Sequence, residues 1–193
     1  LAIGENGAGW VAVKEQRWVE GYWDSASERA HQQIRLQEIR KQAQSISDEI
    51  QLADDQHARR CDLAFDIGER TTVSDTHRKA LRGVIEEHGA RSSESSVHMH
   101  AIYGDYDKAK ALVRACQEVL GRNLNCNSTK WIFIGDSGND AAAFSHFEHT
   151  VGVANVREHL DKLPKPPVYL TRADRGKGFA ELAQHILSNR SLP

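Results

Sequence analysis

The chain has 193 residues, which is enough for one sizeable domain or two small ones. Its formal net charge of −2 excludes a strongly basic surface, and no apolar run approaches the ~20 residues of a membrane span, so we expect neither nucleic acid nor a membrane as a partner. Three scattered cysteines, Cys61, Cys116 and Cys126, favour a reducing compartment over a disulfide scaffold, and we expect a cytoplasmic location.

The first part of the chain predicts a hairpin followed by a long helix. Residues 1–23 are rich in glycine and then in aromatic and β-branched residues, which is typical of a β-hairpin packed through Trp10, Trp18 and Trp23. Residues 25–59 predict a helix, because apolar residues recur every three to five positions. These residues are Ile34, Ile39, Ala43, Ile46, Ile50 and Ala53.

Two strands around a second helix are predicted next. Residues 61–67 form a short apolar run, and residues 97–103 alternate as a strand does. Between them Ser74 predicts a helix cap, with His77 at the capping-box position, and Gly89 predicts the helix end. The expected buried face of this helix is Ala80, Leu81, Val84 and Ile85. The region therefore predicts a small α+β unit.

The last 90 residues alternate between predicted helices and strands. A helix over 107–120 precedes strands over 131–135, 150–155 and 167–171, with short helices between them, and a final helix begins at Gly178. Strands that alternate with helices predict a parallel, doubly wound sheet.

The segment IFIGDSGNDAAAF, residues 132–144, carries the chemistry. The strand places Asp136 at its carboxyl end, where ligands bind in open α/β sheets, and Asp140 follows in the first turn of a helix. Two close carboxylates repel each other in apolar surroundings unless a cation neutralises them, and oxygen ligands favour Mg²⁺ where phosphate is also bound. The alternative is a simple turn and helix cap, since Asp, Ser, Gly and Asn all favour such positions.

The segments GDSGNDAAAF, VGVANV and LTRADRGKGF resemble the C-terminal part of haloacid dehalogenase superfamily phosphatases. They are most similar to the group with a large inserted cap: sucrose-phosphate phosphatase, mannosyl-3-phosphoglycerate phosphatase and the Cof-like hydrolases. The resemblance implies an α/β fold, with a Rossmann-like core that is incomplete at its N-terminus and an inserted α+β cap. We expect residues 1–9 and 105–193 to form the core and residues 10–104 the cap.

The same resemblance implies roles for individual residues. Asp136 would bind Mg²⁺, Asp140 would orient the water shell of the ion, and Asn139 would support them. Residues 106–112 resemble the DKGxAL motif, so Lys108 would pair with the nucleophile and the transferring phosphate, although Ala109 replaces the usual glycine. A lysine in the first turn opposes the helix dipole, which favours an anionic partner; the alternative is a solvated lysine.

The resemblance also implies a nucleophilic aspartate in a DxDxT segment that precedes an ENGA turn. The chain begins at such a turn, IGENGAGW, and we expect it to be a fragment or a relative that has lost the nucleophile. The one internal candidate, DLAFDIGERTT, lies after the turn and has Gly68 where the acid–base aspartate is needed. We therefore expect Asp66 to be a cap residue without a catalytic role.

His98 and His100 share one side of a strand. No third metal ligand is evident beside them, so a polar sheet face is the simpler interpretation. If the cap sheet faces the active site, as the resemblance implies, these histidines and Arg70 would contact the substrate.

We therefore expect a Mg²⁺-dependent hydrolase of a phosphate monoester, with a sugar phosphate or a similar small phosphorylated metabolite as substrate. The catalytic residues would include Lys108 and Asp136. The main alternative is a non-catalytic protein that binds phosphate and metal. A doubly wound module that binds a partner is disfavoured, because such modules carry no cap insertion between the ENG turn and the lysine.

Overall fold

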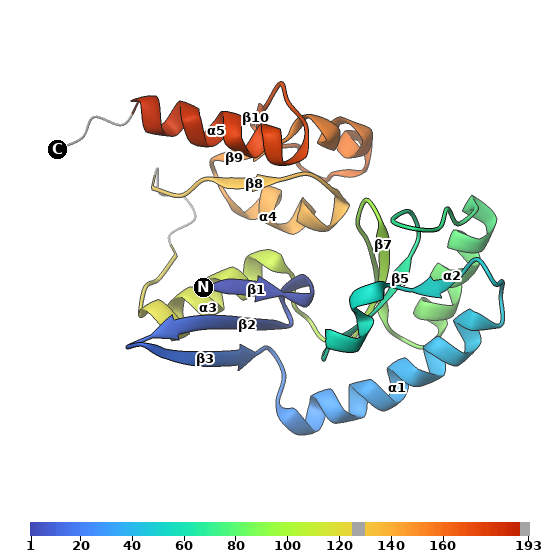
Figure 1. The fold of residues 1–193 in the computed structure, drawn as a ribbon. Helices are drawn as coiled ribbons and strands as arrows, with labels where there is room; N and C mark the ends of the chain where they lie inside the picture. The colour runs from blue at the N-terminus through green and yellow to red at the C-terminus, as the bar shows by residue number, and fades with distance from the viewer. Residues whose placement is uncertain (125–129, 190–193) are drawn as a thin grey trace. The chain divides into compact units, whose positions relative to one another are not determined.

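A computed structural model describes residues 1–124 and 130–189, so Cys126 lies outside the described residues. The chain folds as two compact units, Leu1–Asn123 and Leu124–Pro193, and each is considered by itself (Figure 1). The predicted division into core (1–9 and 105–193) and cap (10–104) stays a prediction.

The first sheet of unit Leu1–Asn123 contains the predicted hairpin. Strands β1 (Ala2–Gly4), β2 (Gly9–Lys14) and β3 (Arg17–Tyr22) pair antiparallel in that order. The predicted helix follows as α3 (Lys108–Leu120), and its Ala115 and Val119 pack against Trp10 and Ala12 of β2. Trp18, on the opposite face, is 76% exposed, so it does not take part in this packing.

The long helix predicted over 25–59 is wrong in its extent. Helix α1 spans Ala26–Gln44 and is followed by β4 (Gln51–Leu52) and the 3₁₀ helix η2 (Asp54–Ala58). Ser45 ends α1, with its hydroxyl bonded to the carbonyl oxygen of Gln42, and serine favours such local bonds over continued helix. The buried residues of α1 are Gln32, Leu36, Ile39 and Ala43, whereas Ile34 is exposed.

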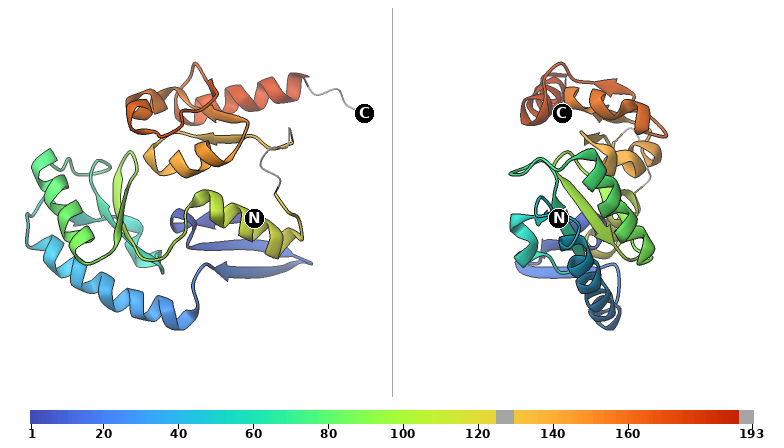
Figure 2. Two further views of the ribbon diagram at one scale, coloured as in Figure 1. Left: turned by 180° about the vertical axis from the view of Figure 1, so that it is seen from behind. Right: turned by 90° about the vertical axis from the view of Figure 1, so that its right-hand side faces the viewer.

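The predicted α+β unit is confirmed as a four-stranded antiparallel sheet in the order β4-β5-β7-β6. Strand β5 spans Asp62–Asp66, β6 spans Arg91–Glu94 and β7 spans His98–Ile102. Helices α1 and α2 (Asp75–Glu87) pack on one face of this sheet (Figure 2). The apolar core between the sheet and the two helices includes Leu63, Phe65 and Met99 of the sheet, Leu36 and Ile39 of α1, and Leu81, Val84 and Ile85 of α2.

The ends of α2 agree with the prediction. The Ser74 hydroxyl accepts a hydrogen bond from the His77 amide at 3.3 Å, and Gly89 has a φ of +72°, which favours glycine. Ala80 was expected on the buried face but is exposed, because it is rotated by about 100° from Leu81, where the buried stripe begins.

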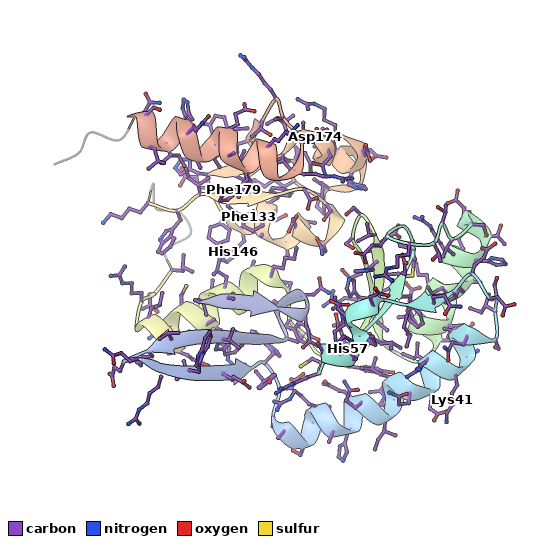
Figure 3. All side chains as sticks on the ribbon, viewed as in Figure 1. Lys41, His57, Phe133, His146, Asp174 and Phe179 are labelled. Atoms are coloured by element: carbon purple, nitrogen blue, oxygen red, sulfur yellow. The ribbon has the colours of Figure 1, made fainter. Side chains whose placement is uncertain are left out.

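Unit Leu124–Pro193 contains the predicted parallel sheet, in the order β10-β9-β8. Its strands are β8 (Phe133–Gly135), β9 (Thr150–Gly152) and β10 (Tyr169–Leu170), joined by η3 (Gly138–Asp140), α4 (Ala141–His146) and η4 (Ala154–Lys162). Phe133, labelled in Figure 3, stacks on Phe147 and meets Phe144 edge to face, which fixes β8 against α4.

The final helix begins earlier than predicted. Helix α5 spans Arg175–Asn189 rather than starting at Gly178. A side chain at Gly178 would clash with the carbonyl oxygen of Ala173, so this glycine serves close packing inside the first turn. Within the described residues, no helix has both the length and the apolar character that crossing a membrane requires.

Candidate functional site

Asp136 stands at the carboxyl end of β8, where the sequence predicted it. The strand is held in the sheet up to its last residue, since the Gly135 carbonyl oxygen accepts a bond from the Val153 amide at 3.0 Å. A Cβ at Gly135 would lie 2.6 Å from the Asp140 Oδ2 atom. Glycine is therefore required here, because the loop folds back onto the end of the strand.

Asp140 holds this loop in its conformation through hydrogen bonds to the backbone. Its Oδ2 atom accepts hydrogen bonds from the backbone amides of Asp136 at 2.8 Å and Ser137 at 3.2 Å. The residue is 4% exposed. Hydrogen bonds from two amides to one carboxylate oxygen fix the position of the Asp136 backbone. Asn139, in the same turn, accepts a bond from the Ser137 hydroxyl at 2.8 Å.

The Asp136 carboxylate has a single hydrogen-bond donor within the described residues. Asn155 donates from Nδ2 to Asp136 Oδ2 at 3.1 Å, and the Asn155 Oδ1 atom accepts from the Arg175 amide at 3.1 Å. Asp136 is half-buried, and its second oxygen accepts no bond from a described residue. Asn155 was not predicted as a site residue, although a polar residue after the next parallel strand is a signal for this edge of a sheet.

The donor set at this loop fits Mg²⁺. It supplies a partly exposed carboxylate with one oxygen still available, a second carboxylate four residues on, and only oxygen ligands. Mg²⁺ is usually bound through one or two carboxylates together with water and phosphate, rather than by a full protein cage. The described residues contain no cluster of three or more His, Cys, Asp or Glu side chains placed to hold a metal.

Lys108 is the first residue of α3 and belongs to unit Leu1–Asn123, so it is described separately from Asp136. Asp107 caps the helix, with its Oδ1 atom accepting from the Lys110 amide at 2.8 Å. The nearby Lys110 ammonium group pairs with Asp105 at 2.7 Å. The start of α3 is thus well defined.

His98 and His100 lie on the face of the β4–β7 sheet that α1 and α2 leave uncovered, with ring centroids 5.9 Å apart. His100 is 4% exposed, and its Nδ1 atom lies 3.0 Å from Asp62 Oδ2. His98 pairs with Glu69 at 2.9 Å. The exposed Arg70 pairs with Asp54. Contact of His98, His100 and Arg70 with a substrate stays a prediction.

Asp62 and Arg59 form a buried charge pair that the sequence did not reveal. Asp62 has no exposed side-chain area, and both of its oxygens accept from Arg59, at 3.0 and 3.2 Å. Burial raises the pKa of the Asp62 carboxyl group, but His100 and Arg59 outweigh this effect and hold the pKa below its usual value. Asp62 is therefore a buried anion that organises its surroundings.

The comparisons with known proteins agree with this architecture. A family model described as haloacid dehalogenase-like hydrolase matches residues 4–165. A comparison with curated proteins finds no match.

Solved structures are similar over most of the chain. A protein of Thermoplasma acidophilum is 17% identical, covering 95% of this chain and 71% of its own, with a TM-score of 0.65. A trehalose-6-phosphate phosphatase related protein is 12% identical, covering 95% and 70%, with a TM-score of 0.55. The sucrose-phosphatase of Synechocystis sp. is 14% identical, covering 86% and 69%, with a TM-score of 0.58. The predicted fold class, a Rossmann-like α/β core with an inserted α+β cap, is confirmed.

Proposed function

Because the chain belongs to the haloacid dehalogenase-like hydrolases, we propose that it is part of a Mg²⁺-dependent phosphomonoester hydrolase acting on a sugar phosphate or a similar small phosphorylated metabolite. The observation that carries this proposal is the Asp136 carboxylate. It stands at the carboxyl end of a parallel strand, and one of its oxygens is left available by the loop around it. Ligands bind at this edge of open α/β sheets.

The sugar-phosphate class is supported by two structural relatives. The solved structure of the Synechocystis sucrose-phosphatase contains sucrose and phosphate, and another relative is described as related to trehalose-6-phosphate phosphatase. At 12–14% identity their likeness shows the fold alone, so the substrate class is our proposal.

The residues at and near the loop after β8 would have different roles at the site. Asp136 would hold Mg²⁺, and Asp140 and Asn155 keep Asp136 in place through bonds to its backbone and its carboxylate. A bound Mg²⁺ ion would neutralise negative charge on the phosphate. Lys108 would place a second positive charge beside the phosphoryl group, and such electrostatic stabilisation accounts for most of the catalysis of phosphoryl transfer.

The attacking carboxylate would come from outside residues 1–193. No DxDxT segment occurs in these residues, and the internal candidate, Asp66, has both oxygens bonded to backbone amides. We expect the 193-residue chain to bind Mg²⁺ and phosphate but to show no turnover of p-nitrophenyl phosphate above background, because covalent catalysis lacks its nucleophile. Robust Mg²⁺-dependent turnover by this chain would contradict the proposal for the nucleophile.

The site assignment is tested by steady-state kinetics on the complete gene product across a Mg²⁺ titration. Asp136→Asn and Lys108→Ala should each lower turnover by about 10²-fold or more, because each removes charge that stabilises the transferring phosphoryl group. Asp140→Asn should do less harm, and added Mg²⁺ should partly restore its activity. Asp161→Asn, a charge-matched change on the exposed surface of η4, is the control and should leave turnover unchanged. A nearly neutral Asp136→Asn would contradict the assignment.

A non-catalytic phosphate- and metal-binding protein is the second candidate. The observation that favours it is the full engagement of Asp62 and Asp66, which leaves neither carboxylate of β5 available for attack. Isothermal titration with Mg²⁺ and inorganic phosphate, together with a turnover assay on the complete gene product, separates the two candidates. Binding without any turnover would support the second.

A further inference from the structure

The turn at Glu5–Gly7, the 3₁₀ helix η1, has an unusual backbone. Its three residues have φ angles of 47°, 57° and 111°, so two non-glycine residues in succession adopt the left-handed region. Such conformations persist only where the surrounding structure determines them. The contacts of the three residues show what holds the turn.

Glu5 connects the turn to the other sheet of its unit. Its Oε2 atom accepts hydrogen bonds from the amides of Arg60 at 2.9 Å, Cys61 at 2.6 Å and Asp62 at 3.1 Å. Hydrogen bonds to a charged acceptor are roughly twice as strong as neutral ones. One carboxylate therefore joins the end of β1 to the start of β5, across more than fifty residues of sequence.

Asn6 adds a second bond to the same place. Its Nδ2 atom donates to Asp62 Oδ2 at 3.2 Å, the oxygen that also faces His100. Asn6 is thus part of the buried hydrogen-bond network of Asp62, Arg59 and His100. Because His100 lies in β7, this network connects the turn to that strand.

Gly7 faces the opposite way, toward α3. A Cβ at this position would lie 2.6 Å from the Asp107 carbonyl oxygen and 2.9 Å from the Ala111 Cβ atom. The turn therefore contacts the first turn of α3, the helix that begins at Lys108. The three residues of the turn bridge two elements: the start of α3 and the start of β5.

We propose that the Glu5–Gly7 turn is a clasp that fixes the Lys108 helix relative to the sheet carrying His98 and His100. The backbone joins these parts through 23–25 and 103–107. Besides the clasp, side chains also connect them: Arg60 reaches Tyr22 and Glu20 of β3, and an apolar cluster crosses between them at Ala8, Cys61, Ile102 and Tyr106. Glu5 and Asn6 are then positioning residues, which set the orientation of the sheet rather than touch a substrate. The geometric coupling stands on the contacts above, and its consequence for substrate binding rests on the proposed function.

The coupling is tested on the 193-residue chain by residual dipolar couplings. In the wild-type chain, a single alignment tensor should fit the amides of β1–β3 and α3 together with those of β4–β7. Glu5→Ala should require two different tensors and should abolish the slowed hydrogen exchange of the Arg60, Cys61 and Asp62 amides. Glu15→Ala is the matched control, because Glu15 also has a left-handed backbone, with φ of 50°, but is exposed and accepts no bond from a described residue.

Glu5→Gln is a second variant for the case in which Glu5→Ala does not fold. It keeps an acceptor oxygen and the shape of the side chain but removes the charge, so protection of the three amides should fall without the loss of either sheet. Unchanged amide shifts inside each sheet show that both variants are folded. A single tensor and retained amide protection in Glu5→Ala or, if that variant does not fold, in Glu5→Gln would overturn the clasp.

A kinetic measurement on the complete gene product tests the consequence for the substrate. If the loss of the clasp lowers the population with the correct orientation to about one tenth, KM for a sugar phosphate rises about tenfold. The kcat for p-nitrophenyl phosphate, which lacks a sugar, should stay unchanged. An equal loss of kcat with both substrates would overturn the positioning role. Absence of all turnover in the wild-type product would contradict the proposed function and leave the dipolar-coupling result intact, so the two failures are distinguishable.

Discussion

The ends of β5 and β8 are alike in sequence and different in structure. Each strand is a short apolar run that leads into an aspartate, Asp66 as the last residue of β5 and Asp136 directly after β8. Asp66 accepts four backbone hydrogen bonds, with Oδ1 bonded to the amides of residues 68 and 69 and Oδ2 to those of residues 70 and 71. Within the described residues the Asp136 carboxylate accepts one hydrogen bond, from the side-chain amide of Asn155, and none from a backbone amide. In this chain, the aspartate at the end of a strand is available to a ligand where the backbone amides of the following loop bond to a different acceptor.

After β8, Asp140 is the acceptor of the loop amides. Its carboxylate accepts the amides of Asp136 and Ser137, which leaves the Asp136 side chain outside the internal bonding of the loop. At β5 the loop has no second aspartate, and Asp66 itself receives the amides. The second Asp of GDSGND thus contributes to the site by freeing the first, whether or not it also contacts the water shell of an ion.

Changes at Asp62, Asp66 and Asp136 test this contrast through the free energy of unfolding. The largest effect is expected at Asp62, the first residue of β5, whose carboxylate is fully buried against Arg59 and His100. Asp62→Ala should lower the free energy of unfolding by about 3–5 kcal/mol, because it removes the carboxylate that Arg59 and the buried His100 share, although Arg59 keeps its second pair with Asp55. Urea denaturation followed by circular dichroism measures the change. Asp55→Ala, which breaks the exposed pair with the same arginine, should cost about 0.3–0.5 kcal/mol. Equal effects of the two changes would contradict the structural role of Asp62.

Asp66→Asn is expected to have an intermediate effect. The amide group replaces one acceptor oxygen and directs a donor at backbone N–H groups, so the variant should lose about 1–3 kcal/mol in urea denaturation. Its activity per folded molecule should not change.

The pH dependence of stability gives an independent test of Asp66. Burial raises the pKa of its carboxyl group, but the four amide hydrogen bonds outweigh burial and hold the pKa below its usual value. The stabilisation is therefore complete above the unfolded-state pKa of about 3.9 and is lost as the pH falls through the folded-state pKa. Wild type and Asp66→Asn should converge in stability at acidic pH, and a constant difference down to low pH would contradict this origin.

Much of the fold and part of the site could be predicted from the sequence. The parallel sheet and the place of Asp136 followed from an apolar strand leading directly into GDSGND, because the geometry of such units leaves few alternatives. The end of α1 could not be predicted, since apolar spacing continues past Ser45. Ile46 and Ile50 pack against the same core from outside the helix, so their burial satisfies the pattern without helical structure.

The burial and the hydrogen-bond partners of the individual carboxylates also could not be predicted from the sequence. The expectation that Asp66 has no catalytic role rested on its place in the chain, whereas the four amide bonds that engage it depend on the conformation of residues 68–71. Nothing in the letters DLAFD distinguishes the buried Asp62, paired with Arg59, from a surface residue. Likewise, the bond from Asn155 to Asp136 joins the start of η4, just after β9, to the residue that follows β8, and it depends on the register of these two strands.

The smallest change in stability is expected for Asp136→Asn. The new side chain keeps an oxygen that can accept the Asn155 bond, and the loop stays fixed by Asp140, so the free energy of unfolding should change by no more than about 0.5 kcal/mol. The variant should differ from wild type in its response to Mg²⁺. At a Mg²⁺ concentration ten times the dissociation constant, wild type should gain about 1.4 kcal/mol from binding, and Asp136→Asn should gain almost nothing at that concentration. Urea denaturation with and without Mg²⁺ measures both quantities on the 193-residue chain and needs no catalysis. If Asp136→Asn were as destabilising as Asp66→Asn and equally responsive to Mg²⁺ as wild type, Asp136 would be a structural residue like Asp66, and the contrast between the two strand ends would be lost.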